Sequence, residues 1–220
     1  DPGHGGIDPG AIGVSGIFEK RVTLGMAQQV RKAILALGRH RVRLTRDRDS
    51  FIPLRRRVAI ARAAGAELFL SIHADSIANR RVRGGGIYTL SETASDKESA
   101  ALAAKENRAD RIAGLNLNGH DDEVTSILID LTQRETMNYS AQFAAALVPE
   151  LRQLIQMRRK PHRFAGFVVL KAPDVPSVLI ELGYLSNRRD EKMLTSPRSR
   201  AAIAKAIARS VDNYFRVQKR

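Results

Sequence analysis

Apolar side chains recur at helical spacing in several stretches of the chain. Over residues 19–37 the apolar positions are Val22, Ala27, Val30, Ile34 and Leu37. Gly38 then follows as a stop signal, so this stretch is predicted to be a helix. The same periodicity predicts helices over 53–64, 100–113 and 197–215, and a longer one over 124–157 that is interrupted near Pro149. Ser95 and Glu98 have the spacing of a capping box at the start of the third helix.

Shorter runs between these stretches have the alternating or continuous apolar pattern of β-strands. They are residues 41–46, 67–73, 87–90, 166–170 and 177–182, and three glycines at 84–86 precede the third run. Strands that alternate with helices and are apolar on both faces are typical of a sheet covered by helices on each side. We therefore predict an α/β domain built around a largely parallel sheet.

Composition and charge narrow the class of protein. The 220 residues suit one domain, and the longest apolar runs are too short to cross a bilayer. The chain has no cysteine, which excludes disulfides and thiolate metal ligands. It begins inside a Gly/Pro-rich loop without a leader sequence, so we expect a fragment from which any export signal is absent.

A net charge of +14 indicates anionic surroundings or an anionic partner. The basic residues are scattered, with few aromatic residues among them and no nucleic-acid-binding motif, so we expect no nucleic-acid partner. Peptidoglycan, whose stem peptides carry free carboxylates, is an equally suitable polyanion. A solvated basic surface without a specific partner is the alternative for any single basic run.

Three residues have the side chains and positions of a catalytic zinc site. His4 lies in a glycine-rich loop, Glu19 opens the first predicted helix, and His73 ends a buried strand. Imidazole and carboxylate groups are zinc ligands, and open sheets build their sites at strand ends. Taken singly, His4 could be a turn residue, Glu19 a first-turn acid, and His73 a hydrogen-bonded histidine at the edge of the core.

Glu181 is a fourth candidate, because it lies in a strand so apolar that burying an unpaired carboxylate there is costly. Near a metal ion such a carboxylate can take a proton from water and later return it. A structural ion pair with one of the arginines is the alternative.

Several motifs together make the chain resemble a known family. They are residues 1–6 (DPGHGG), 8–11 (DPGA), 19–20 (EK), 44–46 (LTR), Leu54 with Arg57, 71–75 (SIHAD) and 180–187 (IELGYLSN). In this order and separation they resemble the zinc-dependent N-acetylmuramoyl-L-alanine amidases of the bacterial cell-division amidase family, over essentially the whole chain. The chain departs from the commoner pattern at Asp75, where Asn is frequent, and at Leu182, where Thr is frequent.

The resemblance implies a function for the four candidate residues. His4, Glu19 and His73 would bind one zinc ion, and Glu181 would be the catalytic acid/base. The reaction would be hydrolysis of the amide between N-acetylmuramic acid and L-alanine in peptidoglycan, in the periplasm, during daughter-cell separation and wall turnover. The implied fold is a six-stranded largely parallel sheet flanked by helices on both faces, its first strand missing or truncated before Asp1.

The resemblance also implies regulation. Residues 1–220 would form one catalytic domain with an inserted regulatory segment around 91–160. That segment would fold as a helix over the active site and be withdrawn by an activator carrying a degenerate LytM-type domain. Glu123 is our first choice for an inhibitory zinc ligand, with Asp122 and Glu106 as runners-up. The alternative is that all three are solvated acids of loops or helix caps.

Two other functions fit parts of the sequence. A zinc exopeptidase or a similar metallohydrolase would use the same ligands on a similar sheet, since a fold does not fix a substrate. A non-catalytic module that binds cell wall or nucleic acid would account for the basic charge, but it would not need Glu181 in an apolar strand.

Overall fold

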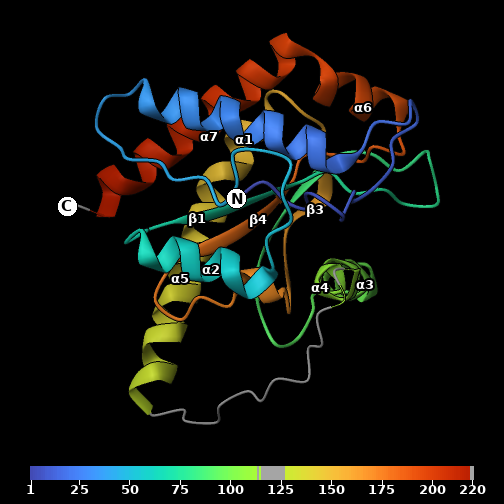
Figure 1. The fold of residues 1–220 in the computed structure, drawn as a ribbon. Coiled ribbons are helices and arrows are strands. Elements are labelled where there is room, and N and C mark those ends of the chain that lie inside the picture. The colour runs from blue at the N-terminus through green and yellow to red at the C-terminus, as the bar shows by residue number, and fades with distance from the viewer. Residues whose placement is uncertain (113, 115–126, 219–220) are drawn as a thin grey trace.

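The computed structural model describes residues 1–112, 114 and 127–218 (Figure 1). In chain order the elements are α1 (Glu19–Leu35), α2 (Leu54–Ala63), β1 (Phe69–His73), β2 (Gly85–Leu90), α3 (Lys97–Glu106), α4 (Ala109–Ile112), α5 (Ile127–Arg152), β3 (Met157–Ala165), the 3-10 helix η1 (Val168–Leu170), β4 (Ser177–Glu181), α6 (Arg188–Thr195) and α7 (Pro197–Gln218). Among these residues no helix is both long enough and apolar enough to span a membrane.

The sheet has four strands in the described part of the chain, in the order β1-β4-β2-β3. β1 is parallel to β4, and β2 is parallel to β3, but β2 and β4 are antiparallel. The α/β class is therefore confirmed, whereas the prediction of a six-stranded, largely parallel sheet is wrong. The spacing of apolar residues in the sequence indicates which face of a helix or strand is buried. It carries no information on which strands pair or in which direction.

The first residues of the chain extend the sheet at the edge of β1. The amide of Gly3 donates to the carbonyl of Ile72 at 3.0 Å, and the amide of Ile72 donates to the carbonyl of Asp1 at 2.9 Å. This short parallel pairing fixes the start of the glycine-rich loop beside the carboxyl end of β1. The loop that carries His4 is thereby held against the strand that ends in His73.

Helices cover both faces of the sheet (Figure 1). On one face α1, α5 and α7 form a buried apolar cluster that includes Met26, Phe143, Ile180 and Ile207. On the other face α2, α3 and η1 pack over a second cluster that includes Tyr88 and Leu179. All five residues of β4 are buried, which explains the run of consecutive apolar residues in its sequence.

Two predicted strands are wrong. Residues 41–46 alternate in polarity but form no strand, and residues 166–170 contain the 3-10 helix η1 instead. In the first case Arg41 and Arg43 are exposed, as the alternation implied, but Arg46 is buried and breaks the pattern. A strand also needs a partner for its backbone groups, and a local pattern cannot supply one.

The helix predicted over 124–157 ends earlier than expected in the described part of the chain. Pro149 lies inside α5, and the helix continues to Arg152. Residues 157–165 then form β3, whose pairing with β2 gives them backbone partners that the sequence pattern does not reveal. The predicted capping box is also wrong, because Asp96 is the N-cap of α3 and accepts from the Ser99 amide at 2.8 Å.

Candidate active site

The loop between the first residues and α1 aims the imidazole of His4. His4 has a positive φ of 59°, and Gly5 and Gly6 also have positive φ, so the chain turns sharply there. Asp8 Oδ2 lies 2.8 Å from His4 Nδ1. This contact fixes the ring and leaves Nε2 as the nitrogen that faces the interior, an arrangement found behind metal-binding histidines.

Two buried arginines hold the carbonyl groups of this loop. Arg57 donates to the carbonyls of Pro2 and His4 at 2.8 and 2.9 Å and to the Asp1 carboxylate at 2.9 Å. Arg46 donates to the Gly3 carbonyl at 2.8 Å. Both guanidinium groups supply hydrogen-bond donors to buried carbonyls in place of solvent, so they help to set the position of the His4 loop.

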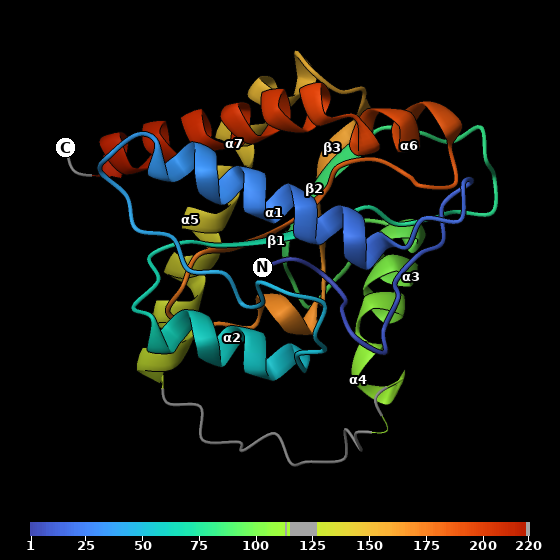
Figure 2. The same ribbon diagram turned by 45° about the horizontal axis from the view of Figure 1, so that its top comes forward.

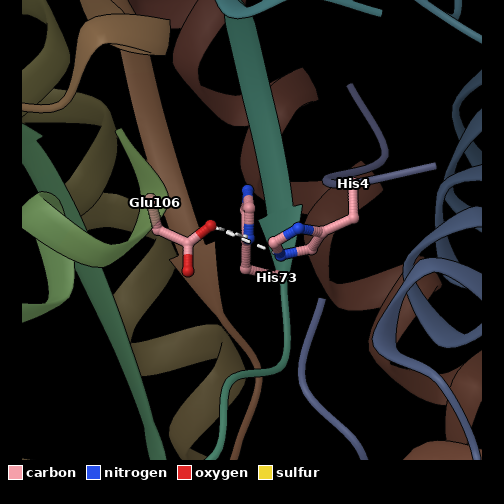
Figure 3. Close-up of side chains that lie close together, drawn as sticks. All are labelled: His4, His73 and Glu106. Atoms are coloured by element: carbon pink, nitrogen blue, oxygen red, sulfur yellow. Dashed lines mark ion pairs between the residues drawn. The ribbon is translucent and has the colours of Figure 1, made fainter. Parts of the chain in front are cut away.

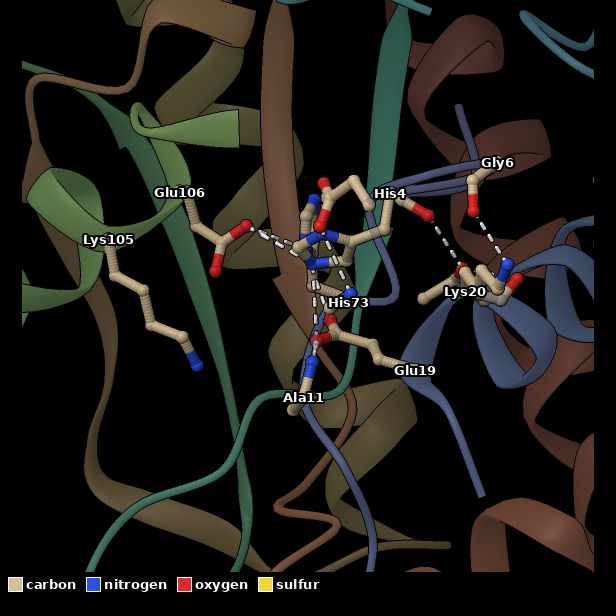
Figure 4. A network of polar contacts seen from close by, with 12 residues as sticks. His4, Gly6, Ala11, Glu19, Lys20, His73, Lys105 and Glu106 are labelled. Atoms are coloured by element: carbon tan, nitrogen blue, oxygen red, sulfur yellow. Dashed lines mark hydrogen bonds and ion pairs between the residues drawn. The ribbon is translucent and has the colours of Figure 1, made fainter. Parts of the chain in front are cut away.

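Glu19, the first residue of α1, is fully buried and joins the loop to the sheet. Its Oε2 accepts from the Ala11 amide and its Oε1 from the Ala74 amide, both at 2.8 Å. The same two oxygens lie 3.1 Å from His4 Nε2 and 3.3 Å from His73 Nδ1 (Figure 4). Glu19 therefore lies between the two imidazoles.

His73 ends β1, and its ring stacks closely against the backbone of Gly3. A Cβ at Gly3 would lie 2.4 Å from Cε1 of His73, so only glycine permits this approach. The rings of His4 and His73 are 5.0 Å apart at an angle of 77°. Two histidines from separate segments thus converge beside Glu19.

Glu106, the last residue of α3, also reaches this group. Its Oε2 lies 3.3 Å from both His4 Nε2 and His73 Nδ1 (Figure 3). One ligand atom from each of the three side chains lies within 4.8 Å of the other two, a separation that one metal ion could bridge. Figure 2 shows α3 beside the loop that follows the N-terminus.

The facing atoms of the two histidines are buried without hydrogen bonds. Neither His4 Nε2 nor His73 Nδ1 has a hydrogen-bond partner in the described part of the chain, because the nearby carboxylates lie outside hydrogen-bond geometry. Unsatisfied buried nitrogens are costly, and they are expected where an ion is bound. Imidazole nitrogens with carboxylate oxygens are a donor set that suits zinc.

The protonation states of His4, Glu19 and Glu106 depend on one another. Burial by itself lowers the pKa of His4, but the carboxylates of Glu19 and Glu106 outweigh burial and raise that pKa well above its usual range. Burial raises the pKa of Glu19, yet His4 and His73 hold it well below the usual range. Burial raises the pKa of Glu106, and the two imidazoles offset this only in part. A cation is the natural counter-charge for this cluster.

Glu181 ends β4 directly beside His73, its register partner on β1. It is 2% exposed, and its Oε2 accepts from the Asp75 amide at 3.0 Å. Its Oε1 has no hydrogen-bond partner among the described residues. Burial, followed by the charges of Asp75 and Glu19, raises the pKa of Glu181 well above its usual range. A buried carboxyl group with a raised pKa is a candidate for proton transfer.

The structure thus brings His4, Glu19 and His73 together and places Glu181 beside His73, while their roles stay predictions. Glu123 and Asp122, two of the three candidates for an inhibitory ligand, lie outside the described residues. The third, Glu106, faces the histidines. The only signal for it in the sequence was an acid at the end of an alanine-rich helical stretch, which is common on solvated helices.

Residues 1–213 match the family model described as N-acetylmuramoyl-L-alanine amidase. The chain is 41% identical to the amidase AmiA of Salmonella typhimurium, covering 98% of this chain and 74% of AmiA. It is 40% identical to AmiC of Neisseria meningitidis, covering 98% of this chain and 51% of AmiC. Among solved structures, AmiC2 of Nostoc punctiforme superposes with a TM-score of 0.71 at 30% identity, covering 98% of this chain and 94% of that one. The chain therefore belongs to the N-acetylmuramoyl-L-alanine amidase family, as a catalytic domain of that family.

Proposed function

We propose that the chain hydrolyses the amide bond between N-acetylmuramic acid and L-alanine of peptidoglycan, with one zinc ion held by His4, Glu19 and His73. The observation that carries the proposal is a pair of buried nitrogens, His4 Nε2 and His73 Nδ1. Each lies beside a carboxylate oxygen of Glu19, at 3.1 and 3.3 Å, and neither has a hydrogen-bond partner among the residues that the structure describes. These residues come from a loop, a helix start and a strand end, so only the fold assembles them.

The donor set fits a catalytic zinc ion. Two imidazole nitrogens and one carboxylate are the protein ligands found in several zinc hydrolases, and the fourth position is left for water or substrate. When bound, the ion supplies Lewis-acid activation of a water molecule and of the substrate carbonyl. Asp8 orients the ring of His4, and the Ala11 and Ala74 amides orient the carboxylate of Glu19.

Glu181 is the proposed acid/base. Its raised pKa, and its Oε1 atom, which has no hydrogen-bond partner among the described residues, suit a group that accepts a proton from the attacking water. The same carboxyl group then protonates the amine of L-alanine as the amide bond breaks. The Asp75 amide bound to Oε2 holds the carboxyl group in place during both transfers.

The relatives support peptidoglycan as the substrate, because they are named N-acetylmuramoyl-L-alanine amidases. The net charge of +14 suits a polymer with free carboxylates. We propose that the chain acts in the periplasm in daughter-cell separation and wall turnover.

The decisive experiment is digestion of purified peptidoglycan by the chain with zinc, with a chelator, and with zinc restored after chelation. New L-alanine amino termini should appear with zinc and after its restoration, and not in the chelator. A zinc exopeptidase would release amino acids from peptide ends instead. A non-catalytic wall-binding module would sediment with peptidoglycan but would release no amino termini.

We further propose that Glu106 blocks this site, in the role for which Glu123 was the first expectation. Its Oε2 lies at the same 3.3 Å from both histidines, where it would take the position that substrate and water need. Asn107, the next residue, bonds the Gly166 carbonyl and the Val168 amide at 2.8 and 2.9 Å. The blocking residue is therefore held at the end of a helix that is tethered to the rest of the domain.

Residues 91–160 are accordingly proposed to form an inserted regulatory segment, with α3 as its inhibitory part. An activator, proposed to carry a degenerate LytM-type domain, would withdraw α3 from the site. Adding such a domain should raise turnover by the intact chain and should have little further effect on a chain carrying Glu106→Gln. An equal stimulation of both proteins would contradict this mode of activation.

A further inference from the structure

On the face of the sheet that carries Glu181, the neighbouring strand β2 is followed by β3, which contributes two arginines, Arg158 and Arg163. Glu181 pairs with Gly86 on β2, and Tyr88, two residues further on the same face, pairs with Arg163 on β3. Gly86 has no side chain, and a Cβ placed there would lie 3.6 Å from both Arg163 Nη2 and the Tyr88 hydroxyl. Because no side chain projects from Gly86, the Tyr88 ring and the Arg163 guanidinium lie over it, next to the strand that ends in Glu181.

Arg163 is buried, and two of its three guanidinium nitrogens lack hydrogen-bond partners among the described residues. It is 3% exposed, and its Nε and Nη2 have no hydrogen-bond partner in the described part of the chain. Its guanidinium carbon lies 5.1 Å from the centroid of the Tyr88 ring. The cation is thus oriented by an aromatic ring and retains unused donors beside the proposed active site.

The carboxylates that lie near these arginines belong to the proposed blocking helix. Nη1 of Arg163 lies 3.4 Å from Glu98 Oε2 and 3.7 Å from Asp96 Oδ2. Arg158 Nη2 donates to both oxygens of Glu98, at 3.0 and 2.7 Å, and the Tyr184 hydroxyl donates to Oε1 at 3.1 Å. Asp96 caps α3, and Glu98 lies in its first turn. One element therefore presents carboxylates both to the histidines, through Glu106, and to the arginines.

We propose that Arg158 and Arg163 form a subsite for a free carboxylate of the substrate's peptide, and that Asp96 and Glu98 occupy this subsite while Glu106 blocks the histidines. This inference rests on the proposed function. β3 lies two strand spacings from β4, about 10 Å. A peptide residue spans about 3.5 Å, so the recognised carboxylate lies about two to three residues beyond the cleaved bond. Guanidinium groups are well suited to carboxylates because they offer paired donors in a planar fork.

The test compares two soluble muramoyl tripeptides that differ only in whether the peptide carboxylates are free or amidated. In a chain carrying Glu106→Gln, the free form should have a KM lower by about 10-fold, which corresponds to one charged hydrogen bond. Adding Arg163→Gln or Arg158→Gln should remove most of this preference through KM, with little change in kcat. Arg163→Lys, which keeps the charge, should restore part of it.

Arg159→Gln is the matched control, because Arg159 is an exposed residue of the same strand and loses the same charge. Equal KM values for the two peptides in the parent chain, or an equal loss in the Arg159 variant, would overturn the subsite. Calorimetric binding of the same two peptides provides a readout that does not require turnover. Failure to cleave either peptide, with selective binding retained, would contradict the proposed reaction and leave the subsite standing.

Discussion

His73 and Glu181 are the last residues of the parallel strands β1 and β4 and lie opposite each other in register. One is a proposed zinc ligand and the other the proposed acid/base, so the pairing of two strands sets the spacing between metal and proton carrier. The two roles can be separated by substitution, because the hydrogen bond from the Asp75 amide can be retained by an amide side chain in place of Glu181.

Glu181→Gln is expected to retain zinc and to lower kcat by about 100- to 10,000-fold, the range for loss of a general acid/base. The reason is that glutamine keeps the shape of the side chain but cannot accept and return a proton. Release of L-alanine amino termini measures activity, and atomic absorption measures bound zinc. Turnover near that of the parent chain would remove Glu181 from the mechanism.

Glu106→Gln is expected to raise basal turnover by at least about 10-fold, since a neutral amide competes less well than a carboxylate for a metal ion. Basal hydrolysis of purified peptidoglycan without an activator is the measurement. Glu135→Gln is the control, because Glu135 is an exposed acid of α5. If both variants matched the parent chain, Glu106 would not be inhibitory.

Gly3→Ala is expected to weaken zinc binding by about 10-fold or more, because a Cβ would lie 2.4 Å from the His73 ring and displace it. Competition with a chromophoric chelator measures the affinity. Gly166→Ala is the control, since its Cβ would meet its nearest described neighbour, the Ser91 carbonyl oxygen, at an ordinary 3.7 Å. Unchanged zinc affinity in Gly3→Ala would argue against His73 as a ligand.

Arg57→Gln is expected to lower the free energy of unfolding by about 3–5 kcal/mol, the range for breaking a buried ion pair. The substitution removes the cation beside the Asp1 carboxylate, the donor to the His4 carbonyl, and one of the two arginine donors to the Pro2 carbonyl. Chemical denaturation of the apo protein provides the measurement. Arg56→Gln, at the exposed neighbouring position on α2, should change the stability by less than about 0.5 kcal/mol.

Elements with a clear apolar pattern, either a stripe at helical spacing or a run of consecutive apolar residues, could be predicted from the sequence. α1, α2, α7 and the strands β1 and β4 lie close to their predicted ranges. Where polarity was ambiguous the predictions failed, as in β3, which contains exposed basic residues and for which no strand was predicted. Its identity depends on pairing with β2, which lies some 70 residues earlier in the chain.

The sequence by itself determined the family, through motifs spread over the chain, and the residue types of the candidate site. Only the tertiary structure decided the strand order, the antiparallel pairing of β2 with β4, and the position of Glu106 beside His4 and His73. The physical reason is that motifs and periodicity are local, whereas pairing, burial and the meeting of charges depend on segments that are distant in the chain. An acid on a helix reads the same in the sequence whether it faces solvent or two imidazoles.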